Sequence, residues 1–512
     1  MKKEIVILAA AAAISLAGCS AAETMVHTEA GTSSVSAGQL SADAVSAAFT
    51  DDAIAINGSG CEADGTALTI TQSGTYVLTG SCSNGSVKVK KGVSGVTLIL
   101  NGLDLTNESG AAIVCGKNSV VTIEAAAGTE NALHDTEQNN NETYPENENA
   151  ENAVIRCKDG SQVVLCGSGS LTIYANGKNG IKSDSTDSES GQEAFLTIRE
   201  LNLTIEAAAN DAVNAEQLLQ VESGTLHLSS PSKALHCDRV INIGAEGTDG
   251  PQITIDTSYE GLEAAEIYIA SGELEITSTD DCLNAANSEL SGADYLIEIS
   301  GGVIRAYTSG GDGFDSNGNI VISGGDVEVW SANTADNQPL DADGTVSVTG
   351  GTVLAAGGSG GMGVRVSAEQ AYVTFGSTGG AKGAMKGGSG GHGQNEMQPG
   401  SDEMQPRGEK PQGDAQMQKP GEPPQNGEEK QAPAMPDGGD ANAAIAADSE
   451  FTLTAADGTV LYSGTARCGL NYVFYSAPEL ADGESYTLAA DGSEQQAQAQ
   501  TGTQESAEAT RR

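Results

Sequence analysis

A short segment repeats along the middle of the chain, and it restricts the fold more than any other feature. Each repeat has an alternating apolar and polar stretch, a turn of small residues, one isolated apolar residue and then an acidic or amide residue. The isolated apolar residues, which we call the anchors, are Ile181, Val213, Leu235, Leu262, Leu283, Phe314 and Leu340. A unit that cannot bury its own apolar face must stack on its neighbours, so the repeats predict a solenoid.

The local pattern predicts which kind of solenoid forms. Stretches of strict apolar and polar alternation are typical of β-strands, and no amphipathic helical window interrupts them between the N-terminal region and the tail. Gly-Gly pairs precede three of the strands and supply tight corners, at Gly301-Gly302, Gly324-Gly325 and Gly350-Gly351. The sequence therefore predicts an all-β fold, a parallel β-helix in which each coil adds one rung.

The chain is strongly acidic, with a formal net charge of −46. A surface of this charge repels nucleic acid and anionic membrane surfaces, so neither is expected as a partner. It must instead be solvated, screened or neutralised by cations.

The N-terminus predicts export. Lys2 and Lys3 precede an apolar run that is too short to span a membrane and that ends in Leu-Ala-Gly-Cys. This ending resembles the bacterial lipobox, which implies lipidation of Cys19 and a protein held at the extracytoplasmic face of the cell membrane. A plain signal peptide with a chance cysteine is the alternative. Membrane contact is expected through the lipid anchor alone.

Composition divides the chain into six segments. They are a lipoprotein signal peptide (1–19), a flexible Ala/Ser/Thr-rich tether (20–50), a parallel β-helix (51–375), a disordered Gly/Gln/Met/Pro-rich insert (376–442), a small β-hairpin unit that caps the solenoid (443–492) and a disordered tail (493–512). We expect a monomer. Cys115 and Cys157 occupy like places in successive coils and are predicted to stack.

Two columns of polar residues appear when the repeats are aligned on the anchors. The plus-one column follows each anchor and contains Lys182, Asn214, His236, Glu263, Asn284, Asp315 and Asp341. The minus-two column precedes each anchor by two residues and contains Asn179, Asp211, Lys233, Glu260, Asp281, Asp312 and Gln338. A further acidic or amide position follows each anchor shortly afterwards and includes Asp343.

Coils repeat every 4.7–4.9 Å or so, which brings bare carboxylates too close together and suits a shared hard cation. Calcium binds six to eight such oxygens in forgiving geometry. The predicted calcium ligands are Asp211, Asn214, Glu260, Glu263, Asp281, Asn284, Asp312, Asp315, Asp341 and Asp343. The alternative is that these are solvated turn residues, because Asp and Asn are favoured in turns.

Aromatic residues form a third pattern at the strand ends. Alternation directs Tyr307 and Trp330 outward in consecutive coils, and Tyr174 holds the same place several coils earlier. An outward strip of rings suits the C–H faces of sugars, so these three residues are predicted to bind carbohydrate. The alternative is that other segments cover them.

Several stretches resemble a known family, the carbohydrate-binding β-helix proteins of clostridial bacteria, which are related in fold to pectate lyases. The stretches include SGTYVLTGSCSNGSVKVKKGVSGVTLILNGLDLTNESG, VVTIEAAAGTENAL, LTIYANGKNGIKSD and the C-terminal FTLTAADGTVLYSG. The resemblance spans roughly residues 54–491 without the insert. It implies a right-handed single-stranded parallel β-helix, calcium in the coils, and binding of cellulose or polygalacturonate-type polymers without cleavage. Lys233 and His236 interrupt the acidic columns, which puts calcium at that coil in doubt.

Three functions are compatible with these features. The first is a cell-surface lipoprotein that binds polysaccharide with calcium, which bridges the carboxylates of protein and polymer. The second is a calcium-dependent polysaccharide lyase, for which Lys233 and Arg239 are the candidate catalytic residues, because removal of a proton next to a uronate requires a base near the metal. The third is a structural adhesin or spacer with a protein ligand.

Overall fold

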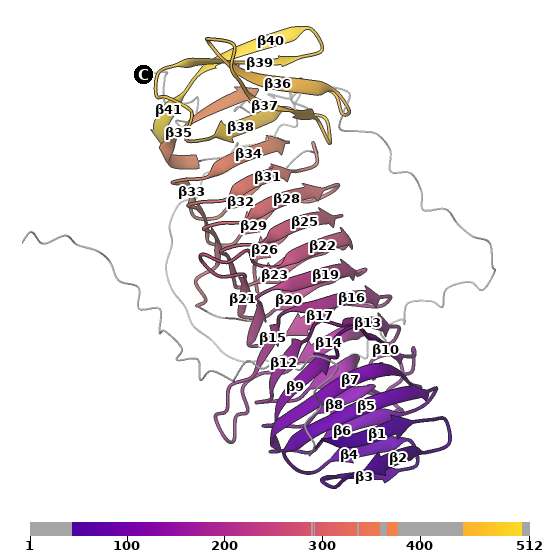
Figure 1. Cartoon of the computed structure of the whole chain (residues 1–512). Coiled ribbons are helices and arrows are strands. Elements are labelled where there is room, and N and C mark those ends of the chain that lie inside the picture. The colour runs from indigo at the N-terminus through magenta and orange to yellow at the C-terminus, as the bar shows by residue number, and fades with distance from the viewer. Residues whose placement is uncertain are drawn as a thin grey trace, which may run out of the picture.

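The computed structural model describes residues 44–287, 290, 292–334, 337–358, 366–376 and 444–503. Within these ranges every assigned element is a β-strand, and the coils stack from β1 at one end to the C-terminal strands at the other (Figure 1). The described part contains no helix with the length and apolar character needed to cross a membrane. The predicted signal peptide, Cys19 and nearly all of the predicted insert 376–442 lie outside the described residues.

Each coil contributes one strand to each of three faces of the solenoid, and strands of one face pair in parallel from coil to coil. Face 1 contains β10 (Glu130–Asp135), β13 (Ser170–Ala175), β16 (Leu201–Ala207), β19 (Gly224–Ser229), β22 (Gln252–Thr257), β25 (Glu273–Ser278), β28 (Val303–Thr308), β31 (Asp326–Trp330) and β34 (Thr352–Gly357). Face 2 contains β4 (Ala67–Ile70), β6 (Ser86–Val89), β8 (Ile113–Cys115), β11 (Ala153–Cys157), β14 (Asn179–Ser183), β17 (Val213–Ala215), β20 (Lys233–Cys237), β23 (Glu260–Ala264), β26 (Leu283–Ala285), β29 (Phe314–Ser316) and β32 (Leu340–Ala342). Face 3 contains β9 (Val120–Ala125), β12 (Gln162–Cys166), β15 (Phe195–Ile198), β18 (Leu218–Val221), β21 (Val240–Ile243), β24 (Glu266–Ile269), β27 (Leu296–Ile299), β30 (Asn319–Ile322), β33 (Val346–Val348) and β35 (Val366–Gly376).

The two ends depart from this pattern. The first strands are β1 (Val45–Phe49), β2 (Ile54–Asn57), β3 (Cys61–Asp64), β5 (Gly74–Cys82) and β7 (Ser94–Asn107), and the last are β36 (Glu450–Ala455), β37 (Val460–Thr465), β38 (Tyr472–Ser476), β39 (Ser485–Ala490), β40 (Ser493–Gln498) and β41 (Gln500–Thr503). Strands β37, β36, β39 and β40 form an antiparallel sheet, while β38 pairs antiparallel with β34 and β35.

Two predicted boundaries are wrong. Strand β1 lies inside the predicted tether, because its alternating apolar residues Val45, Ala47 and Phe49 are buried against the first coil. Strands β40 and β41 lie inside the predicted disordered tail. Their sequence is polar, but backbone pairing with β39 and β35 holds them in place.

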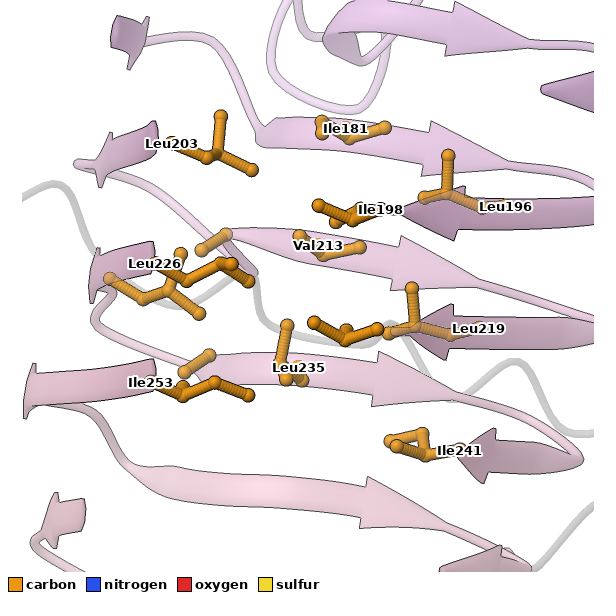
Figure 2. Close-up of a cluster of buried hydrophobic side chains, with 14 of the residues drawn as sticks. Ile181, Leu196, Ile198, Leu203, Val213, Leu219, Leu226, Leu235, Ile241 and Ile253 are labelled. Carbon is orange, nitrogen blue, oxygen red and sulfur yellow. The ribbon is translucent and has the colours of Figure 1, made fainter. Parts of the chain in front are cut away.

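The predicted register of the anchors is confirmed along face 2. Each anchor is the partner of the next, from Ile181 to Leu340, and all are almost fully buried. Figure 2 shows Ile181, Val213 and Leu235 stacked above one another inside the coils, with leucine and isoleucine side chains of the other faces packed against them. Burial of this continuous apolar column is the main term that favours stacking.

The glycine corners and the cysteine stack also follow the sequence pattern. Gly302 adopts a φ of 88°, and a Cβ at Gly301 would lie 2.3 Å from the carbonyl oxygen of Ala270 in the coil below. Glycine is therefore required at Gly302 for its left-handed φ and at Gly301 for lack of space. Cys115 and Cys157 are partners in β8 and β11, and both are buried as free thiols.

Two adjacent residues of β28, one buried and one exposed, allow the contribution of core burial to stability to be measured. Ile304 is fully buried, whereas Val303 is 36% exposed. We expect Ile304→Ala to lower the free energy of unfolding by about 2–5 kcal/mol, because it leaves a cavity in the core. The matched variant Val303→Ala should change it by less than about 0.5 kcal/mol. Urea denaturation followed by circular dichroism measures both, and equal effects would contradict the inward and outward assignment.

Candidate metal centre

The two polar columns lie on and beside face 2. Members of the plus-one column are direct partners from Lys182 to Asp341. In the minus-two column, one carboxylate oxygen accepts a backbone N–H of the next coil. Asp281 Oδ1 accepts from the Asp312 amide at 2.7 Å, and Asp312 Oδ1 accepts from the Gln338 amide at 2.6 Å. These aspartates therefore link coils through one oxygen and present the other to their surroundings.

In the lower coils the protein supplies its own cations. Lys182 Nζ lies 2.9 Å from both Asn214 Oδ1 and Glu216 Oε1, and 4.0 Å from Asp184 Oδ1. One coil further down, the Arg156 guanidinium lies 2.6 Å from Asp184 Oδ2. A lysine ammonium thus fills the place between oxygens of successive coils that a metal ion would otherwise take.

The coil of Asp211 is also satisfied internally. Asp211 accepts hydrogen bonds from the Lys233 amide at 3.0 Å and from Asn214 Nδ2 at 2.6 Å, and its Oδ2 lies 3.1 Å from His236 Nδ1. Although burial opposes the charge, these hydrogen bonds and the histidine lower the pKa of Asp211 to about 2. The same contact raises the pKa of His236 against the effect of burial. The predicted metal role of Asp211 and Asn214 gains no support from this geometry.

The next coil, which contains Glu260 and Glu263, is only partly neutralised by the protein's own cations. Lys233 Nζ lies 2.9 Å from Glu263 Oε2 and neutralises that carboxylate. Burial and the adjoining Glu263 carboxylate raise the pKa of Glu260 well above its ordinary value. Asn284 Nδ2 donates to Glu260 Oε1 at 3.3 Å, while Glu260 Oε2 and Asn284 Oδ1 are buried without a donor among the described residues.

Above this coil, neither polar column holds a built-in cation within the described residues. Asp312, Asp315 and Asp341 each place a carboxylate oxygen within 4.8 Å of the others. Asp281 joins them through its bond to the Asp312 amide. Asp343 is exposed at the edge of this group. We call Asp281, Asp312, Asp315 and Asp341 the acidic cluster.

The carboxylates of the acidic cluster have raised pKa values. Burial, followed by repulsion from neighbouring carboxylates, raises the pKa of Asp281 to about 7, of Asp312 to about 8 and of Asp315 to about 6. Burial likewise raises the pKa of Asp341. A cation bound among these carboxylates would favour their charged forms and lower these pKa values.

A buried amide lies beside the acidic cluster. The Gln338 side chain is 91% buried and reaches Asp341, and its Oε1 has no hydrogen-bond donor in the described part of the chain. Several carboxylates with an amide oxygen form a set that suits a hard divalent cation such as calcium. The sequence analysis named the four aspartates as calcium ligands but not Gln338. Apart from the coil of Lys233 and His236, it did not separate them from the lower coils, where lysine and arginine act instead.

The aromatic strip is wrong as an open surface. Tyr307 and Trp330 are partners in consecutive coils, as predicted, but Trp330 is only 1% exposed. Its Nε1 donates to Glu328 Oε1 at 2.8 Å, and Phe451 of β36 packs edge-on against its ring. Tyr307 packs against the same apolar cluster. The C-terminal sheet covers both rings, and its residues follow more than 100 positions later in the sequence.

Tyr174 lies elsewhere on face 1. Its ring stacks on that of His134 one coil below, with centroids 4.6 Å apart. One face of the Tyr174 ring is therefore covered by His134. Sequence reasoning missed Tyr259, which is 49% exposed and directly precedes Glu260. Its position directly before a member of the minus-two column was the sequence feature that could have identified it.

The lyase candidates are not arranged as a general base. Burial disfavours the charge on Lys233, but its hydrogen bond to Glu263 and the nearby carboxylates outweigh this and raise the pKa of Lys233. The amine therefore stays protonated near neutral pH. Arg239 is exposed in the turn after β20.

The chain belongs to the family of carbohydrate-binding domain-containing proteins. Residues 64–363 match the family model described as carbohydrate-binding domain-containing protein, and this range includes both polar columns.

Two further proteins are similar to parts of the chain. A carbohydrate-binding domain-containing protein of Acetivibrio thermocellus is 32% identical over 177 residues, which are 34% of this chain and 56% of that protein. The chain thus spans little more than half the length of this relative. A polysaccharide lyase-like protein from C. thermocellum, solved as a gadolinium derivative, aligns with 59% of this chain and 96% of its own at 19% identity, with a TM-score of 0.36.

The raised pKa values predict how pH affects the metal-free protein. The folded state binds more protons than the unfolded state between the ordinary carboxyl pKa and the folded values of about 6 to 8, so stability falls as pH rises through this window. We expect a lower thermal midpoint at about pH 8 than at about pH 5.5 in the presence of chelator. Calcium at about 100 times its Kd should add ~2.7 kcal/mol at the higher pH.

The variant Asp312→Asn serves as the control, because it keeps the oxygen that accepts the Gln338 amide and removes the charge. His236 changes stability in the same direction and is unaffected by this substitution. Most of the calcium response should therefore disappear in the variant while part of the pH response remains. An unchanged calcium response would exclude the acidic cluster as its origin.

Proposed function

We propose that this protein is a non-catalytic, cell-surface protein that binds an acidic polysaccharide, such as polygalacturonate, through calcium held by the acidic cluster. The observation that carries the proposal is the change along face 2. Lysine, arginine and histidine neutralise the columns up to Glu263, and the coils above contain four buried or half-buried carboxylates with no such partner among the described residues. Family membership supports carbohydrate as the ligand class.

Calcium explains how two polyanions bind each other. A protein of net charge −46 repels a uronate polymer unless a cation lies between them. Calcium accepts six to eight oxygens, so Asp312, Asp315 and Asp341 leave positions for oxygens of the ligand and water. A neutral polymer such as cellulose would not need this bridge.

Further parts of the proposal concern the rest of the chain. We propose lipid attachment at Cys19, on the strength of the Leu-Ala-Gly-Cys ending, which places the solenoid outside the cell membrane. Parallel strands joined by crossover connections are almost always right-handed, which supports a right-handed coil. The C-terminal unit, which pairs through β38 with β34, is proposed to cap the solenoid against edge pairing.

The binding proposal is tested by calorimetric titration of the chain with polygalacturonate. We expect binding with calcium and none with chelator. Asp312→Asn and Asp341→Asn should each weaken binding by roughly tenfold or more, since the number of charged ligands tunes calcium affinity over orders of magnitude. Asp482→Asn is the matched control, because it removes the same charge from an exposed position in the C-terminal unit. Equal binding in chelator would refute the calcium bridge.

The same material distinguishes the two alternatives. A lyase would release an unsaturated product that absorbs ultraviolet light, and Lys233→Ala would abolish that signal. We expect no such absorbance, because Lys233 is held protonated by Glu263. An adhesin with a protein ligand would ignore the polysaccharide both with calcium and with chelator.

A further inference from the structure

Tyr259 is an exposed aromatic side chain on a rigid turn. Among the described residues, the large apolar side chains that are well exposed are Tyr259, Val303 and Val460, and Tyr259 is the aromatic one. It lies between β22 and β23. Its amide donates to the Ser232 carbonyl of the coil below at 2.8 Å, and its carbonyl accepts from the Asp280 amide of the coil above at 2.8 Å. Its backbone is therefore held from both sides while the ring faces solvent.

The turn of Tyr259 leads directly to the acidic cluster. The coil above presents Asp280 at the position of Tyr259, followed by Asp281, whose Oδ1 accepts the Asp312 amide of the next coil. Tyr259 is thus one coil below Asp281 and two below Asp312, with about 4.8 Å for each coil. Its hydroxyl interacts with the Asp280 carboxylate of the coil above, which raises the pKa of Tyr259.

The position above Asp280 in the next coil has no room for a side chain. Gly311 occupies the place above Asp280, and a Cβ there would lie 2.5 Å from both Asp280 Oδ1 and Asp281 Oδ1. A side chain would therefore collide with the carboxylates. Glycine is therefore required beside the Asp280 and Asp281 carboxylates, which lie one coil below Asp312 and Asp315.

We infer that Tyr259 is a sugar-stacking subsite for a uronate-containing polysaccharide that runs along the solenoid axis, with a ligand carboxylate at the ion bound by Asp312, Asp315 and Asp341. This inference rests on the proposed function and deepens it. An aromatic ring with an exposed face offers the apolar surface that the C–H face of a pyranose covers. Because ring and ion are separated by two coils, the ligand must be an oligomer of several sugar residues, and one galacturonate cannot reach both.

The experiment is calorimetric titration of the full chain, in calcium, with galacturonate and with a short oligogalacturonate. We expect Tyr259→Ala to weaken oligomer binding about 3- to 10-fold, while Tyr259→Phe keeps wild-type affinity within about twofold, because the ring supplies the contact. Calcium binding in the absence of sugar and the thermal midpoint should not change. Tyr268→Ala is the matched control, since Tyr268 is a partly exposed tyrosine of β24 in the same coil, on face 3.

Each other outcome has a definite meaning. If Tyr259→Ala binds the oligomer like the wild type while Asp312→Asn does not bind, the stacking subsite is wrong and the calcium bridge stands. An equal loss in Tyr259→Phe and Tyr259→Ala would assign the effect to the hydroxyl bond with Asp280 and overturn stacking. If the wild type binds neither the oligomer nor polygalacturonate, the proposed function fails and takes the subsite with it.

Discussion

The in-register stacking of coils is the constraint on which the rest of this structure depends. Parallel pairing repeats the same position of each coil at about 4.8 Å, so each residue contacts the residues at the equivalent positions of the coils above and below. For the anchors this is favourable, because one aliphatic side chain covers the next, as for Ile181 and Val213. For residues of like charge the same spacing causes electrostatic repulsion, which must be neutralised.

The lower and upper coils of face 2 differ in how this repulsion is neutralised. Lys182 binds oxygens of Asn214 and Glu216, and Lys233 neutralises Glu263, so the lower coils are complete without added ions. In the upper coils the corresponding positions are Asp281, Asp312 and Asp315, whose raised pKa values reflect unrelieved repulsion and burial. The lower half is thus neutralised by its own side chains, whereas the upper half keeps the carboxylates at which we propose that calcium binds.

Local periodicity made much of this arrangement predictable. The anchors, the glycine corners, the stack of Cys115 on Cys157 and the two polar columns all follow from a repeat that is visible in the letters alone. Prediction was less successful where segments distant in sequence meet. Trp330 points outward as its strand alternation requires, yet Phe451 covers it. Strand β1 was missed because it is short, although its apolar residues are buried. Strands β40 and β41 were missed because their polar sequences carry little signal and backbone pairing holds them in place.

The sequence by itself determined the solenoid, its register and the membership of the acidic columns, because a repeating unit with one apolar anchor has a single way to stack and bury it. Only the tertiary structure decided which column members lack a partner, since this depends on side-chain contacts between coils such as Lys233 with Glu263. It also decided which aromatic rings face solvent. Trp330 is enclosed by a sheet from the far end of the chain, whereas Tyr259 remains open beside the carboxylates.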